Sequence, residues 1–101
     1  MTFDPIGDFL SDYARRERAV EQAVERHSAA HHRYTVRYSK LERLRRTLDE
    51  NGLGDRFEQI AADDLAELRI FEDAEAAEWR AYQRAKAKLD DADHAMRDMG
   101  L

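Results

Sequence analysis

Two histidines and two glutamates have the side-chain types and the spacing of a metal centre. His27 and His31 are separated by about one helical turn, and so are Glu75 and Glu78. Imidazole and carboxylate groups are ligands of zinc and iron, and the facing helices of a bundle are where proteins build such sites. The four residues therefore form a candidate metal site, provided that the chain brings the two pairs together.

A second interpretation gives the same four side chains a structural role. Histidine and glutamate can hydrogen-bond across a pair of helices and fix its register, as buried polar residues do in some coiled coils. The Glu-x-x-His spacing of ferritin-like di-iron proteins is missing, because no Glu precedes a His by three residues. We favour the structural layer and predict no metal or other cofactor, and a metal-binding bundle is the alternative.

A helix stop followed at once by a helix start stands at the middle of the chain. Gly52 can take the left-handed conformation that ends a helix, and Leu53 can then pack on Leu48 in a Schellman motif. Asp55 followed three residues later by Glu58 has the spacing of a capping box for a second helix. The chain has only one Pro and four Gly, so few other positions interrupt a helix.

Matching signals stand at the two ends of the chain. Asp4 before Pro5, or alternatively Asp8, can cap the first helix, and Gly100 can end the second. We therefore predict one all-α domain that folds as a long antiparallel two-helix hairpin. Its bounds are 1–101, with the first helix over about residues 5–51, the turn at 52–54 and the second helix over about residues 55–99.

In both predicted helices, mostly apolar residues recur at alternating steps of three and four, which is the heptad spacing of a coiled coil. They form a stripe along each helix, and the two stripes are predicted to meet along the contact between the helices, here called the seam. In the first helix this stripe comprises Ile6, Leu10, Tyr13, Glu17, Val20, Val24, His27, His31, Tyr34, Tyr38, Leu41, Arg45 and Leu48. In the second it comprises Phe57, Ala61, Asp64, Leu68, Phe71, Glu75, Glu78, Tyr82, Ala85, Leu89, Ala92, Met96 and Met99.

Folding the chain at its central turn pairs the two stripes. His31 then lies opposite Glu75, and His27 lies opposite Glu78. Alanines at positions 23, 30, 74, 81 and 95 flank the stripes and would let the helices approach closely. The predicted hairpin therefore brings the two imidazoles and the two carboxylates to neighbouring levels of one seam.

The distribution of charge argues against direct binding of nucleic acid. The net charge is −5; residues 1–50 carry ten Lys/Arg and nine Asp/Glu, whereas residues 51–101 carry seven and thirteen. A general nucleic-acid binder needs a basic face, because neutralising phosphates supplies most of its affinity. We expect no direct contact with nucleic acid. The acidic second half leaves one alternative, an inhibitor that mimics nucleic acid in the groove of another protein.

Membrane insertion and catalysis both lack a sequence signal. No apolar run approaches the length of a membrane span, and residues 1–5 lack the basic and apolar segments of a signal peptide. We therefore expect a cytoplasmic protein without membrane contact. Phosphate-binding loops and nucleophile motifs are missing, and without cysteine there is no thiolate chemistry. The chain is predicted not to be an enzyme.

Apolar residues outside the two stripes point to partners. A single helix pair cannot cover all of them, and a second copy forming a four-helix-bundle homodimer is the simplest cover, followed by another protein. We predict a nonenzymatic protein–protein interaction module, such as an adaptor, an assembly factor or a phage-type inhibitor of a larger protein machine. The residues assigned to partner binding are Val36, Ile60, Leu65, Ile70 and Trp79.

In outline, a chain of 101 residues folded as one helical hairpin is similar to the small substrates of type VII secretion systems. The residues Asn51-Gly52-Leu53-Gly54 stand where those proteins have a Trp-x-Gly turn. Their C-terminal Tyr-x-x-x-Asp/Glu signal is not matched, because Tyr82 is followed four residues later by Lys86. The resemblance stops at length and shape, so it assigns no family.

Overall fold

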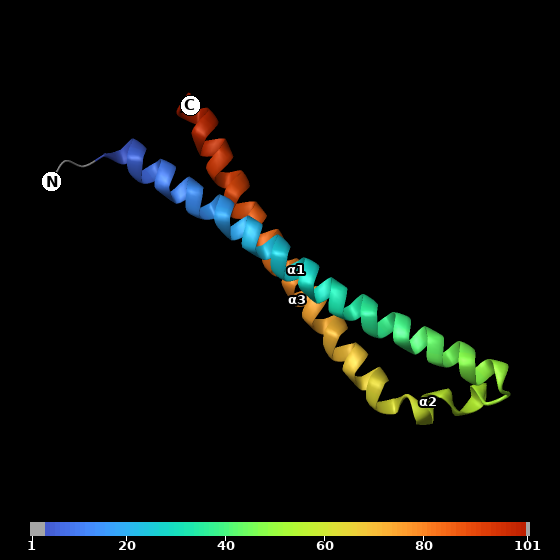
Figure 1. Cartoon of the computed structure of the whole chain (residues 1–101). Helices are drawn as coiled ribbons and strands as arrows, with labels where there is room; N and C mark the ends of the chain where they lie inside the picture. The colour runs from blue at the N-terminus through green and yellow to red at the C-terminus, as the bar shows by residue number, and fades with distance from the viewer. Residues whose placement is uncertain (1–3, 101) are drawn as a thin grey trace. The chain divides into compact units, whose positions relative to one another are not determined.

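All regular secondary structure that a computed structural model describes for this chain, over residues 4–100, is helical. The prediction of an all-α protein is therefore confirmed for this range. Residues 1–3, which contributed to the signal-peptide argument, and residue 101 lie outside it. The elements are α1 (Pro5–Glu50), the 3-10 turn η1 (Gly54–Arg56), the single-turn helix α2 (Phe57–Ile60) and α3 (Ala62–Asp98) (Figure 1).

Helix α1 begins and ends with the capping interactions that its sequence indicates. The carboxylate of Asp4 accepts a hydrogen bond of 3.0 Å from an amide of the first turn, and the next residue is the proline. At the other end Gly52 has a φ of 72°, and the amide of Leu53 donates to the carbonyl of Leu48 at 2.8 Å. These features define a Schellman motif, so the predicted stop at Gly52 is confirmed.

The second helical segment begins differently from the prediction. Neither η1 nor α2 has a side-chain cap, so the predicted capping box of Asp55 and Glu58 is wrong. The reason is that η1 begins at Gly54, which places Asp55 inside the turn rather than before it. The chain breaks again at Ala61, with φ −96° and ψ 11°, although the sequence predicts a continuous helix from about residue 55.

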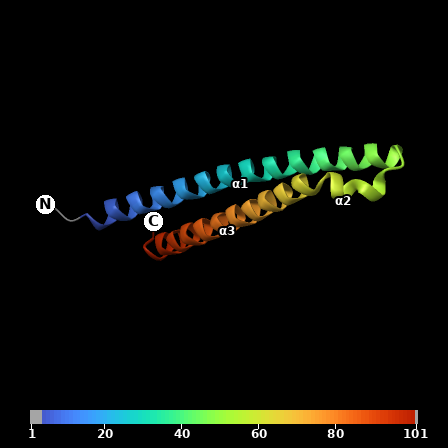
Figure 2. The ribbon, with the colours of Figure 1, turned by 90° about the horizontal axis from the view of Figure 1, so that it is seen from below.

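The chain packs as two compact units, each of which contains a segment of α1 and a segment of α3. Unit 1 comprises Met1–His27 and Glu78–Leu101, and unit 2 comprises Ser28–Ala77. Within unit 2 the chain reverses direction after α1, α2 returns beside the last turns of α1, and the first turn of α3 lies beside the part of α1 around Arg37 (Figure 2). Each unit therefore contains its own pair of helical segments, one from α1 and one from α3.

The hydrophobic core lies in unit 2, around the chain reversal. It joins the end of α1 to α2 and to the break before α3, so burial of apolar surface holds the turn in place. The break at Ala61 is part of this core, because that alanine is completely buried. The buried residues are Leu41, Leu48, Phe57 and Ala61, with Leu44, Leu65 and Leu68 packed against them.

Candidate functional site

The buried face of α1 is not quite the predicted seam. At alternate residues of the predicted stripe, the buried side chain is that of the preceding residue. Ala23 and Ala30 are almost completely buried, whereas Val24 is 45% exposed and Tyr38 is 47% exposed. Alanine lets two helix backbones approach closely, and the dense contact that results outweighs the larger apolar surface of valine. Five predicted seam positions are therefore wrong, because the side chains are exposed: Glu17, Val24, His31, Tyr38 and Arg45. The residue before each of them is buried or half-buried instead: Arg16, Ala23, Ala30, Arg37 and Leu44.

The predicted contact between His31 and Glu75 is present in unit 2. The Nδ1 atom of His31 lies 2.7 Å from Oε1 of Glu75, within hydrogen-bonding distance. The side chain of His31 is 59% exposed and that of Glu75 is 23% exposed, because the histidine lies at the flank of the helix pair rather than inside it. The pair can link α1 to α3, and it is an ion pair when the imidazole is protonated.

His27 belongs to an aromatic cluster in unit 1. Its ring centroid lies 5.3 Å from that of Trp79, and Trp79 lies 5.3 Å from Tyr82. These rings and Val24 line a surface hollow of about 240 Å³. Most of the lining is aromatic or aliphatic, so the hollow is suited to an apolar side chain of another molecule.

The four residues of the candidate metal site fall into two pairs that belong to different units. His27 and Glu78 lie in unit 1, and His31 and Glu75 lie in unit 2. Glu78 forms an ion pair with Arg26, at 3.4 Å between Oε2 and Nε. Across residues 4–100, no group of three or more His, Asp or Glu side chains is placed to hold a metal ion.

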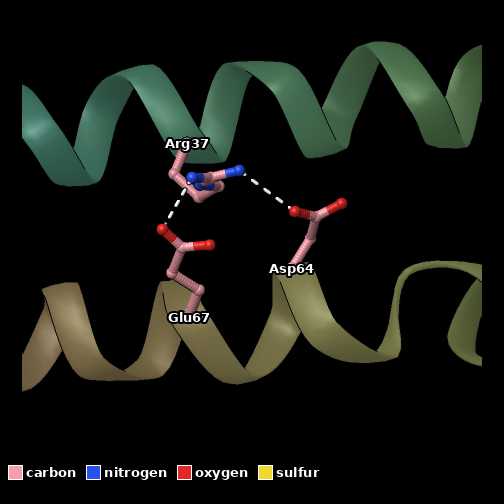
Figure 3. A network of polar contacts seen from close by, with 3 residues as sticks. All are labelled: Arg37, Asp64 and Glu67. Carbon is pink, nitrogen blue, oxygen red and sulfur yellow. Dashed lines mark hydrogen bonds and ion pairs between the residues drawn. The ribbon is translucent and has the colours of Figure 1, made fainter.

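Arg37 contacts three residues of α3, and sequence reasoning missed it. Its Nη1 donates to Oδ1 of Asp64 at 3.0 Å, and its Nη2 donates to Oε1 of Glu67 at 2.7 Å (Figure 3). The guanidinium carbon lies 5.9 Å from the ring centroid of Phe71. Only 21% of the side chain is exposed. Arg37 therefore fastens α1 to α3 by charge-assisted hydrogen bonds.

The sequence does contain a pattern that indicates the partly buried position of Arg37. Arg37 lies seven residues after Ala30 and seven before Leu44, so it continues the stripe that the structure buries. Asp64 is a charged residue in the predicted seam of the second helix. A buried-face carboxylate needs a nearby cation, and Arg37 is the one that the corrected seam brings to it.

Polar contacts also cross between the helices in unit 1. The hydroxyl of Tyr13 donates to Oδ1 of Asp93 at 2.7 Å, and Nη1 of Arg16 donates to the carbonyl of Lys88 at 2.6 Å. The hydrogen bond to Asp93 raises the pKa of Tyr13 above its ordinary value, and burial and the charges of Asp93 and Glu17 act in the same direction.

Four of the five residues assigned to partner binding are exposed. The accessible fraction is 55% for Val36, 53% for Ile60, 64% for Ile70 and 46% for Trp79. Leu65 differs, because it is partly buried against the core of unit 2. Large apolar side chains that remain this accessible are candidates for contact with another protein.

Charge is segregated within unit 2. Residues 28–50, here called the basic segment, carry six Lys/Arg and three Asp/Glu. Residues 54–77, the acidic segment, carry eight Asp/Glu and two Arg. The two segments lie side by side, so one edge of the unit is positive and the other is negative.

None of the helices within residues 4–100 contains an apolar stretch long enough to cross a membrane. Comparison of the chain with protein-family models, with curated proteins and with solved structures finds no match.

Proposed function

We propose that the protein is a nonenzymatic protein–protein interaction module that binds through exposed faces of its helices. The proposal retains the predicted single coiled-coil-like hairpin and its ability to form a homodimer. The observation that carries it is the exposure of Trp79, which remains 46% accessible while its ring packs between His27 and Tyr82. Tryptophan is among the side chains that most often dominate the binding energy of protein interfaces.

The surroundings of Trp79 support this role. Val24 on α1 is nearly half exposed and lines the same hollow, so the tryptophan is the centre of a small apolar surface drawn from both helices. Arg26 and Glu78 lie next to it and supply polar groups at its edge. An apolar centre with a polar rim is the usual composition of a protein-binding surface. An adaptor, an assembly factor or an inhibitor of a larger machine would each use such a surface.

Quantitative affinity capture from the source cells tests the proposal. The tagged chain is compared with Trp79→Ala and with Arg80→Ala, a matched control at the exposed neighbouring position. We expect a discrete partner that the control retains. Trp79→Ala should bind it at least about 30-fold more weakly, because truncating an interface hot spot costs about 2 kcal/mol or more. Circular dichroism checks that both variants remain helical.

The capture experiment has a clear contrary outcome. The proposal would be contradicted if no captured protein were recovered in a constant ratio to the tagged chain. It would also be contradicted by a partner that is bound equally well by Trp79→Ala, Val36→Ala and Ile60→Ala, because these three changes remove exposed apolar groups from both units.

Mimicry of nucleic acid is supported by one observation, the concentration of eight acids in the acidic segment. The basic segment lies beside it, however, and Arg37 neutralises part of the charge of Asp64 and Glu67. A mimic of the phosphate backbone should present an extended negative face, which this arrangement interrupts. We therefore place mimicry second. Displacement of DNA from the captured partner by the purified chain would move it to first place.

A further inference from the structure

The exposed residues Val36 and Ile70 lie on the same side of unit 2. Arg37 packs over the ring of Phe71, so these two positions mark where α1 and α3 face each other. Val36 precedes Arg37 by one residue, and Ile70 precedes Phe71 by one residue. When two right-handed helices run antiparallel, the residue one position before each of two facing residues points to the same side of the helix pair. We call this side the Val36–Ile70 face.

The two residues also lie at the same level along the helix pair. The contact between His31 and Glu75 fixes the level of one α1 residue against one α3 residue. Val36 follows His31 by five residues, and Ile70 precedes Glu75 by five. Because the helices run in opposite directions with the same rise per residue, these equal counts bring Val36 and Ile70 level with each other.

Charged residues of opposite sign flank the two apolar residues of this face. Arg33 and Arg43 lie before and after the valine on α1, and Asp63 and Asp73 lie before and after the isoleucine on α3. By the same count, Arg33 is level with Asp73 and Arg43 is level with Asp63. Within residues 4–100, none of these four side chains forms an ion pair. Their charges are therefore available to another molecule.

We propose that a second copy of the chain covers the Val36–Ile70 face, with the basic segment of each copy packed on the acidic segment of the other. A twofold axis parallel to the helices produces this arrangement. It places Val36 of one copy on Ile70 of the second copy, and Arg43 of one copy beside Asp63 of the second copy. The proposal rests on the proposed function and deepens it by naming the occupant of one face.

Charge decides between this arrangement and its alternative. A twofold axis across the helices would instead set basic segment on basic segment and acidic segment on acidic segment. Like charges would then oppose each other along both contacts, which disfavours that pairing. In the proposed arrangement each contact joins a segment that carries six Lys/Arg and three Asp/Glu to a segment that carries eight Asp/Glu and two Arg, so the net charges have opposite signs. Each copy supplies the same surface, so the dimer is closed and does not extend into fibres.

Sedimentation equilibrium of Ile70→Arg tests which face is used. The native chain should be a dimer at micromolar concentration. Ile70→Arg should weaken dimerisation at least about 30-fold, because it replaces a central apolar contact by a charge facing the basic segment. Tyr38→Arg is the matched control, since Tyr38 follows Arg37 and turns to the opposite side while being 47% exposed. A monomeric native chain, or equal weakening by both variants, would overturn the proposal.

Mixing two charge-reversal variants tests which segments meet. Arg43→Glu and Asp63→Arg should each form weaker homodimers than the native chain, because both symmetric contacts become repulsive. An equimolar mixture should recover the dimer as a heterodimer. One of its contacts joins the two substituted residues with their charges exchanged, the other joins native Arg43 to native Asp63, and both contacts are attractive. No recovery on mixing would show that Arg43 does not meet Asp63 of a second copy, and would overturn the arrangement.

Thiol cross-linking tests the direction of the axis, and it is simplified because residues 4–100 include no cysteine. A short bismaleimide should link chains in a mixture of Val36→Cys and Ile70→Cys, and neither variant alone. Efficient linking of Val36→Cys to itself would overturn the proposal in favour of the alternative axis.

The two proposals fail in different ways. A chain that sediments as a monomer while its Trp79-dependent partner is still captured would overturn the second-copy contact and leave the proposed partner binding through Trp79 standing. A dimer with the mixed cross-link and without a Trp79-dependent partner would support the second-copy contact and count against the proposed function.

Discussion

Unit 2 and unit 1 are built from the same two long helices but are held together by different contacts. Unit 2 encloses Leu41, Leu48 and Phe57, which bury large apolar surfaces. The most buried residues that the structure describes in unit 1 are the alanines Ala23 and Ala92, and polar groups join its helices. Apolar burial contributes about 25 cal/mol per Å², whereas a typical hydrogen bond contributes about 1 kcal/mol net. Unit 2 should therefore supply most of the stability, and unit 1 should open first.

Truncation of the core gives the largest expected difference between the units. Phe57→Ala should lower the free energy of unfolding by about 3–5 kcal/mol, because it leaves a cavity in the core of unit 2. Leu10→Ala is the counterpart in unit 1, where Leu10 is 49% exposed, and it should change stability by less than about 1 kcal/mol. Urea denaturation followed by circular dichroism measures both. Equal losses would mean that the two units do not differ as described.

Removal of Arg37 should have the next largest effect. Arg37→Met should destabilise the protein by about 2–3 kcal/mol, because it leaves the carboxylates of Asp64 and Glu67 without their charged donor. Arg26→Met removes an ion pair in unit 1 whose arginine is 56% exposed, and it should cost less than about 1 kcal/mol. Chemical denaturation compares the two variants. The contrast would be refuted by an Arg37→Met protein as stable as the native chain.

The two left-handed glycines should respond differently to the same substitution. Gly52 has φ 72° and Gly100 has φ 74°, and a Cβ at either position meets no atom within 4 Å. The penalty of Gly52→Ala is therefore backbone strain, about 1–2 kcal/mol. Gly100→Ala should cost less, because the last turn of α3 can unwind locally, whereas Gly52 joins two packed segments. Thermal melts of both variants provide the measurement, and a larger loss for Gly100→Ala would contradict the reasoning.

The smallest effect concerns Tyr13 and appears only at alkaline pH. The folded pKa of Tyr13 is raised above the unfolded value of 10.0, so folding favours the neutral phenol. Its contribution to stability is complete below pH 10.0 and is lost as pH rises through the folded pKa. The native chain should therefore lose more stability than Tyr13→Phe between pH 9 and pH 11, a window set at about one unit on either side of the unfolded value. Urea midpoints measure the difference, and parallel pH profiles would count against it.

Signals that act over a few residues predicted the structure well. Gly52 was identified as the end of the first helix because a left-handed residue must stop it, and the Schellman hydrogen bonds are present. Counting outward from that turn was sufficient to place His31 opposite Glu75. The seam of the second helix was also correct from Phe57 to Met96, since each of its positions is buried or half-buried. Local rules and chain reversal together determine these features.

Features that depend on packing between distant segments were not predictable in the same way. Ala23 and Val24 both fit a heptad pattern, and hydrophobicity alone selects the valine, which the structure leaves nearly half exposed. Ala61 is a good helix former, so nothing local marks the break there. Arg37 finds its carboxylates 27 and 30 residues away, and no short motif connects them. In each case the deciding contact forms only after the helices meet.

The nearly inaccessible alanines of α1 reverse the usual relation between the size of a side chain and its freedom to vary in evolution. At Ala23 and Ala30 only glycine or serine could be accommodated without pushing the neighbouring helix away, whereas the bulkier Val24 has room on its solvent side. Distant homologues should therefore keep small residues at these two positions. Weight on two small residues seven positions apart would identify such homologues more readily than weight on the large apolar side chains.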